Sequence, residues 1–148
     1  MHRRNFVKST LALSAAPAAL FAANEQSTPT AGQPFRLRYA PHDGMFRQSA
    51  GPDILDQLRF MADQGFTAFE DNGMSGREPA LQEKMGALMN QLGIAMGVFV
   101  AHKIYWSEPN LASGNKDKRE EFLRDIRNAV EVAKRCNAKW MTVVPGHV

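Results

Sequence analysis

The residues best equipped for chemistry stand directly after short apolar stretches of the chain. Glu70 and Asp71 follow Phe66–Phe69, and His102 closes the stretch that begins at Ile94. A carboxylate in such a place can act as a general base or hold a substrate hydroxyl, and a histidine can move protons near neutral pH. We therefore take Glu70 and His102 as candidate catalytic residues and Asp71 as a candidate substrate-binding residue. The alternative for Glu70 is a structural acid that pairs with a loop arginine or caps backbone amides.

Three further residues are candidates for substrate binding. His42 follows the first apolar segment, His147 follows the last, and Trp106 lies in the longest loop. Trp106 forms either a pocket wall or a cover over apolar residues of its loop. No His, Cys, Asp or Glu residues have the close spacing of metal ligands, so a metal site must be assembled from separate strands.

The pattern of apolar residues predicts the strands and helices that would position these residues. We predict strands at residues 35–40, 66–69, 94–102 and 138–144. Three amphipathic helices begin near Pro52, Pro79 and Asp117, and Asp117 with Glu120 fits a capping box. The inward stripe of the last helix includes Leu123 and Val130.

The lengths of the connections favour one architecture. Gly65, Gly93 and Asn137 leave only one or two residues between a helix and the next strand, whereas the loops from strand to helix are long. Long loops at the carboxyl ends of parallel strands are typical of a (β/α)8 barrel or an open α/β sheet, with the site on that face. No glycine-rich phosphate turn follows the first strand, which favours the barrel.

A barrel of this kind has eight strands, and the sequence supplies four. The predicted fold class is therefore α/β, the amino-terminal half of a (β/α)8 TIM barrel with four parallel strands and three helices. Half a cylinder leaves two open parallel edges. We expect either that the sequence is a piece of a longer protein or that two copies assemble into a homo-oligomer.

The amino terminus has the layout of an export signal. Arg3 and Arg4 form a twin-arginine pair before a small, apolar run that ends at Ala23 and is too short for a comfortable membrane span. We predict a twin-arginine signal peptide at 1–23, a linker at 24–34 and the partial barrel domain at 35–148, with the mature protein in the periplasm. Cleavage after Ala18, Ala22 or Ala23 is equally compatible with the pattern.

The charge balance and the cysteine count exclude two classes of protein. Residues 1–23 hold three of the 18 basic residues and no acid, so 18 − 3 = 15 basic residues face 15 acidic ones in the remainder. A neutral mature chain argues against nucleic acid as a partner. Cys136 is the single cysteine, which excludes an intrachain disulfide, and packing is its expected role.

Several motifs together carry a family resemblance over about residues 35–146. Leu37–His42 with Gly44–Phe46, then Gly65–Glu70, then Gly93–Ile94 leading to Val98–Val100, resemble the xylose-isomerase-like TIM barrels. These form the sugar phosphate isomerase/epimerase superfamily, and the hydroxypyruvate isomerase branch is the most similar.

The resemblance implies an isomerase that moves a proton between adjacent carbons of a hydroxy-carbonyl compound or sugar, with help from a divalent metal ion. The metal ligands of this family come from the second half of the barrel. We therefore expect them beyond Val148 and assign none in this chain. For this chain the resemblance implies only the part of the site wall that comes from the first half of the barrel, namely His42, Glu70 and His102.

Two other functions fit the same barrel. One is a metal-dependent hydrolase. The other is a non-catalytic periplasmic carbohydrate-binding protein, which would keep Tyr105 and Trp106 and lack the second-half carboxylates.

Overall fold

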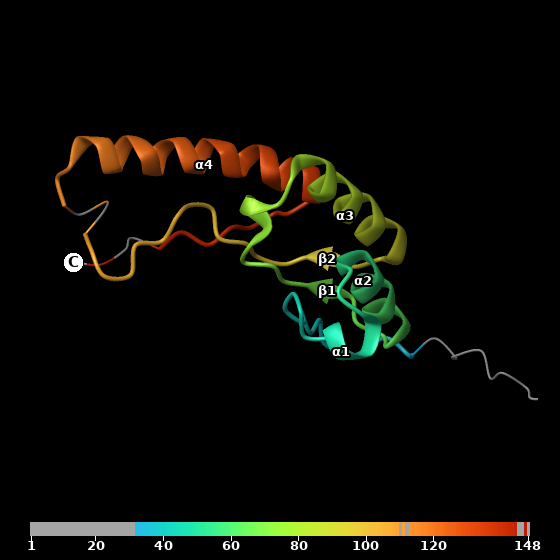
Figure 1. Cartoon of the computed structure of the whole chain (residues 1–148). Helices are drawn as coiled ribbons and strands as arrows, with labels where there is room; N and C mark the ends of the chain where they lie inside the picture. The colour runs from blue at the N-terminus through green and yellow to red at the C-terminus, as the bar shows by residue number, and fades with distance from the viewer. Residues whose placement is uncertain (1–31, 110, 112, 145–146, 148) are drawn as a thin grey trace, which may run out of the picture.

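The structure is a computed structural model that describes residues 32–109, 111, 113–144 and 147. The predicted signal segment and most of the predicted linker lie outside these residues. The described chain is mixed α/β (Figure 1), and its elements in order are α1 (Arg47–Ala50), α2 (Ile54–Asp63), β1 (Ala68–Phe69), the 3-10 turn η1 (Met74–Gly76), α3 (Pro79–Leu92), β2 (Ala95–Met96) and α4 (Lys116–Cys136).

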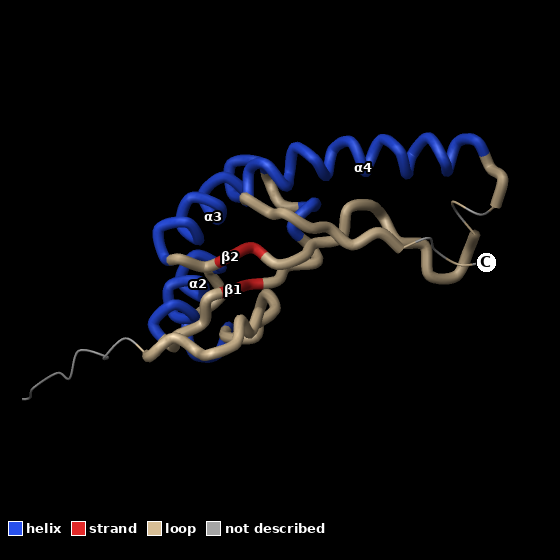
Figure 2. The backbone as a smooth tube through the Cα atoms, turned by 180° about the vertical axis from the view of Figure 1, so that it is seen from behind, coloured by secondary structure: helices blue, strands red, loops and turns tan. Residues whose placement is uncertain are grey.

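The two strands form a parallel sheet in which Ala68 lies opposite Ala95 and Phe69 opposite Met96. Three single parallel bridges extend this pattern, namely His42 with Glu70, Val100 with Thr142 and Pro109 with His147. Extended segments of the chain therefore lie side by side in the order in which they occur in the sequence (Figure 2).

Two of the four predicted strands are present, in shortened form, as β1 and β2. The prediction of a strand at residues 35–40 was wrong, because the Tyr39 amide donates to the carbonyl of Leu37 and so leaves no ladder bond at this point. The bridge to β1 forms only later, at His42. The segment 138–144 likewise meets its neighbour at a single bridge, so it is not a regular strand.

The three predicted helices are confirmed as α2, α3 and α4. Asp53 caps α2 by accepting from the Leu55 amide at 2.7 Å. The predicted capping box at Asp117 was wrong by two residues. The cap of α4 is Asn115, whose side chain accepts from the amides of Asp117 and Lys118, because this polar residue precedes the helix while Asp117 is already inside it.

One core joins the strands to the long helices, which lie in an arc around one side of them (Figure 1). In α2 the buried positions follow the helical repeat, with Ile54, Gln57, Leu58 and Met61 facing inward. In α4 the buried residues are Ala129, Val132 and Cys136. The predicted inward positions Leu123 and Val130 are each 43% exposed. Leu123 lies in the amino-terminal half of α4, which extends past the strands (Figure 1). Val130 lies in the carboxyl-terminal half, away from the helix face that buries Ala129 and Val132.

The helices α3 and α4 pack in close contact. Gly86 permits it, because a Cβ at this position would overlap the carbonyl oxygen of Arg135. Gln82, fully buried, donates to the carbonyls of Met74 and Arg77 and accepts from the Arg135 guanidinium at 2.9 Å. The α3–α4 pair is thereby tied to η1, which borders the site described next.

Among the described residues, no helix combines the length and the apolar character needed to cross a bilayer.

Candidate functional site

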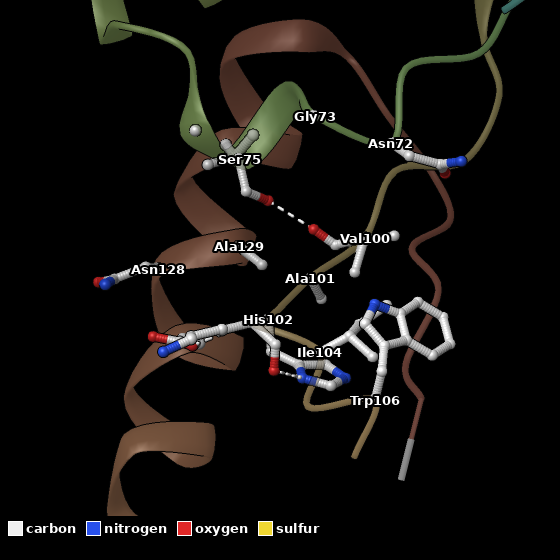
Figure 3. A pocket seen from close by; sticks show the side chains of 14 residues that line it. Asn72, Gly73, Ser75, Val100, Ala101, His102, Ile104, Trp106, Asn128 and Ala129 are labelled. Atoms are coloured by element: carbon white, nitrogen blue, oxygen red, sulfur yellow. Dashed lines mark hydrogen bonds between the residues drawn. The ribbon is translucent and has the colours of Figure 1, made fainter. Parts of the chain in front are cut away.

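A cavity of about 600 Å³ opens beside the segments that follow β1 and β2, and we call it the carboxyl-end cavity (Figure 3). This volume lies within the range of small-molecule sites. Its wall consists of Asn72, Gly73, Ser75 and Gly76 after β1, residues 100–104 and Trp106 after β2, and Asp125, Asn128, Ala129 and Val132 of α4.

The lining divides into an apolar floor and a polar rim. Val100, Ala101 and Ile104 form much of the floor, and Trp106 stands at one side with 76% of its surface exposed. Asp125 and Asn128, three residues apart on α4, add a carboxylate and an amide. The arrangement suits a small ligand that has an apolar face and several hydroxyl groups.

His102 lies in this wall but is held by backbone on both sides. Its Nδ1 lies 2.8 Å from the carbonyl oxygen of Lys103, and its Nε2 accepts from the amide of Val144 at 2.9 Å. Because an amide can only donate, Nε2 carries no proton and Nδ1–H is the donor to Lys103. The ring is only 6% exposed and packs edge-on against Phe122. In this arrangement His102 joins two segments, and both of its nitrogens are in use.

The loop that carries Trp106 is fastened to α4. The Lys103 amide donates to Asp125 at 3.2 Å, and the Tyr105 hydroxyl donates to Glu121 at 2.8 Å. The Nζ atoms of Lys103 and Lys118 lie 4.5 and 4.4 Å from the centre of the Tyr105 ring. The contact with Tyr105 raises the pKa of Lys103 above its ordinary value.

Asp71 takes the structural role that the sequence left open for Glu70. Its side chain, from a residue only 1% exposed, accepts from the Gly73 amide at 2.9 Å and from Arg77 Nε. Arg77 also donates to Asp43 at 2.7 Å, so one guanidinium joins the loops that follow the first two extended segments. Burial acts to lower the pKa of Arg77, but the hydrogen bond and charge of Asp71, and then those of Asp43, outweigh it and raise the pKa.

The remaining predicted site residues lie outside the carboxyl-end cavity as the structure lines it. Glu70 and His42 form a pair of their own, in which the Glu70 amide donates to Pro41 and the Glu70 carbonyl accepts from Asp43, both at 3.0 Å. Within the described residues, the Glu70 carboxylate has no hydrogen-bond or ion-pair partner. His147 is exposed and meets Pro109. The structure thus brings His102 together with Trp106, and Glu70 with His42.

Sequence reasoning missed Asp125, Asn128 and Arg77. Asp125 and Asn128 belong to the charged face of a long helix, where a single sequence offers no means of separating lining residues from solvated ones. Arg77 stood in a loop that the sequence did identify, six residues after Asp71, but its pairing depends on the fold.

The described residues contain no group of three or more His, Cys, Asp or Glu that could hold a metal ion. Glu70 and His42 alone do not make up the ligand set of a divalent ion. The described residues therefore do not fit the expected metal by themselves.

Comparisons of the chain with protein-family models, with curated proteins and with solved structures found no match.

Proposed function

We propose that the chain binds a small polyhydroxylated compound, a sugar or a hydroxy-carbonyl compound, in the carboxyl-end cavity. The observation that carries the proposal is the exposed Trp106 beside an apolar floor, with Asp125 and Asn128 on the rim. An aromatic face packs against the C–H side of a sugar ring, while carboxylate and amide groups take its hydroxyls.

Tryptophan fluorescence tests this proposal directly, because the sequence contains two tryptophans. In the Trp140→Phe variant, the signal comes from Trp106 alone. Titration with xylose, glucose and dihydroxyacetone should give saturable changes for at least one of them. Asp125→Asn should weaken that binding about tenfold, on the scale of a hydrogen bond to a charged group.

Glu131→Gln supplies the matched control, since this acid lies on the same helix, outside the cavity, and pairs with Lys134. It should bind as the parent does. If none of the three compounds changes Trp106 fluorescence, or if Asp125→Asn and Glu131→Gln behave alike, the proposed site is wrong.

A second candidate function is the isomerase or epimerase of the resembling family, on the amino-terminal half of a (β/α)8 barrel. Support comes from the unpartnered Glu70 carboxylate at the carboxyl end of β1, beside His42. The parallel chain-order arrangement of the segments also agrees with a barrel. The divalent metal would be held by ligands outside the described residues. Participation of His102 in proton transfer would require release of its bond to Val144.

Isotope exchange separates the two candidates. An isomerase acting through proton transfer incorporates deuterium from D₂O into the carbon next to the carbonyl, whereas a binding protein does not. In a full-length barrel, Glu70→Gln should lower the exchange rate by a factor on the order of a hundred or more. Exchange that Glu70→Gln leaves unchanged would remove Glu70 from the mechanism.

Export by the twin-arginine route and a periplasmic location remain part of the proposal. Arg3→Lys together with Arg4→Lys should leave a longer precursor in the cytoplasm, as seen on immunoblots of cell fractions. Normal export of this variant would contradict the twin-arginine assignment.

Association of the chain is proposed as well. Phe35, Leu37 and Tyr39 on one outer segment and Val143 on the other are exposed apolar residues, as expected of a sheet with open flanks. Analytical ultracentrifugation of residues 24–148 should show a dimer or larger species. A monodisperse monomer that melts cooperatively would show that the described elements suffice.

A further inference from the structure

A second cavity, of about 450 Å³, lies at the opposite end of the strands, and we call it the amino-end cavity. Ala68 and Ala95 at the starts of β1 and β2 belong to its lining. It is distinct from the carboxyl-end cavity, and the proposed sugar binding makes no use of it.

The cavity exists because two neighbouring segments separate toward their amino ends. Near Thr142 they are joined, since Ala101 donates to the Thr142 carbonyl at 3.0 Å and Thr142 donates to Phe99 at 2.8 Å. At the other end, the amides of Ala95 and Gly97 donate to the carbonyls of Thr67 and Phe69, on the opposite side of β2. The space between β2 and residues 139–140 is thus left to the cavity.

The cavity has an apolar floor, and the charged residues of its lining are basic. Its floor is apolar and includes Met89, Ile94 and Cys136, while Arg38, Lys139 and Trp140 stand at the rim. Of the described residues that line this cavity, none is acidic. In the described part of the chain, Arg38 and Lys139 have no hydrogen-bond or ion-pair partner, and Trp140 is 72% exposed.

The helix ends nearby reduce this positive charge but do not cancel it. The carboxyl ends of α3 and α4 reach the cavity at Asn90 and Asn137, and each helix end carries about half a negative charge. Two full positive charges therefore face roughly one negative charge in all. The balance favours an anion over a cation or a neutral polar group.

We propose that the amino-end cavity binds a small organic carboxylate with an aromatic body. The body would fill the apolar floor beside Trp140, and the carboxylate would pair with Arg38 and Lys139. A guanidinium matches the geometry of a carboxylate, and an aromatic body suits a cavity of this volume.

Binding to the Trp106→Phe variant of the full chain tests this, because Trp140 is then the reporting tryptophan. Three probes separate the contribution of the aromatic ring from that of the negative charge. Benzoate has both the ring and the charge, benzamide has the ring without the charge, and inorganic phosphate has charge without a ring. Benzoate should give a saturable change in Trp140 fluorescence and bind at least about tenfold more tightly than benzamide. Phosphate at the same concentration should not displace it.

Variants locate the benzoate. Arg38→Gln and Lys139→Gln should each weaken its binding about tenfold. Arg36→Gln and Lys134→Gln are the controls, since both residues are exposed cations outside the cavity, and they should leave binding unchanged. Ala40→Leu, at an exposed position of the rim, should weaken benzoate and benzamide alike by narrowing the opening.

Three results would overturn the proposal. Equal binding of benzoate and benzamide would show that the cations take no part, and displacement by phosphate would show a general anion effect. Absence of any saturable change with benzoate would show that no such site exists. Circular dichroism spectra identical to that of the parent ensure that each variant is folded when it is titrated.

Discussion

The two cavities lie at opposite ends of the same pair of strands, and each has an exposed tryptophan at its rim. The carboxyl-end cavity carries one charge of each sign, Lys103 and Asp125, whereas the amino-end cavity carries Arg38 and Lys139. The first is therefore suited to a neutral polar ligand and the second to an anion. The same two strands border both cavities, and the different charges at their rims lead us to expect two different ligands.

The two ends also differ in what holds them. Long loops at the carboxyl ends are fastened by side chains, such as Asp71 with Arg77 and Tyr105 with Glu121. The amino ends are reached by tight turns, in which Gly93 and Asn137 take left-handed conformations with φ of 69° and 57°. Substitutions of polar side chains should therefore disturb the carboxyl end far more than the amino end.

The largest effect should come from Arg77→Ala, which leaves the buried Asp71 without its partner. We expect a loss of about 3 kcal/mol in the free energy of unfolding, at the low end for a broken buried pair because Arg77 itself is partly exposed. Urea denaturation measures it. Adding Asp71→Asn should recover part of the loss by removing the unpaired charge.

Arg59→Ala is the control for that measurement, because Arg59 pairs with Asp56 in solvent. Its loss should stay below about 1 kcal/mol. Comparable losses for Arg77→Ala and Arg59→Ala would mean that the Asp71 pair does not organise the carboxyl end.

The next effect should come from His102→Ala, which removes the acceptor of the Val144 amide and the donor to the Lys103 carbonyl. We expect a loss of about 2 kcal/mol in the free energy of unfolding, since buried groups lose their partners. His147→Ala, at an exposed residue, should change stability by less than about 0.5 kcal/mol. If His102→Ala keeps full stability and abolishes turnover in a full-length barrel, the catalytic interpretation of His102 holds instead.

The difference between the two ends also explains what the sequence could predict. The helices and the turns at Gly65 and Gly93 depend on neighbouring residues, so stripes and glycines were sufficient to locate them. The bond from Val144 to His102 spans 42 residues, and that from Arg77 to Asp43 spans 34. Such pairs depend on how the segments lie together, which no local pattern encodes.

The strand predictions were limited in the same way, because a strand depends on partners that are distant in the sequence. Alternation at residues 35–40 satisfied the rule for a strand, but a strand also requires a continuous partner, and Tyr39 turned its amide to Leu37 instead. The carboxyl-end placement of His102 and Trp106 followed from parallel order alone. Parallel order did not predict that His102 lines the carboxyl-end cavity while Glu70 lies outside it, because that difference depends on which side of the loops each residue occupies.

A third prediction tests the amino end through Cys136, which is fully buried in its floor. Burial raises the pKa of this thiol. The folded state therefore holds the proton at a pH where the unfolded chain, with a thiol pKa of about 8.5, releases it. Stability that is present below about pH 8.5 should fall as the pH rises above that value.

Urea denaturation at pH 7.5 and 9.5 measures this fall, and Cys136→Ala should reduce it. The thiol should also react with a disulfide reagent on the order of a hundredfold more slowly in the folded chain than in urea. Rapid reaction in the native state would show that the floor of the amino-end cavity is open to solvent.

The smallest effect on stability should come from Tyr105→Phe, which removes the hydrogen bond to Glu121 and keeps the ring in contact with Lys103 and Lys118. The expected loss is about 0.5–1 kcal/mol, the net value of one hydrogen bond at a partly buried site. Trp106 is the next residue along this loop, so looser fastening should lower its fluorescence anisotropy and weaken xylose binding at the carboxyl end. Benzoate binding at the amino end should not change, because the Tyr105 loop does not reach that cavity. Tyr105→Ala, which also removes the ring, should enlarge the effect on xylose only. A parallel loss of benzoate binding in either variant would mean that the two ends are coupled, and the comparison between them would fail.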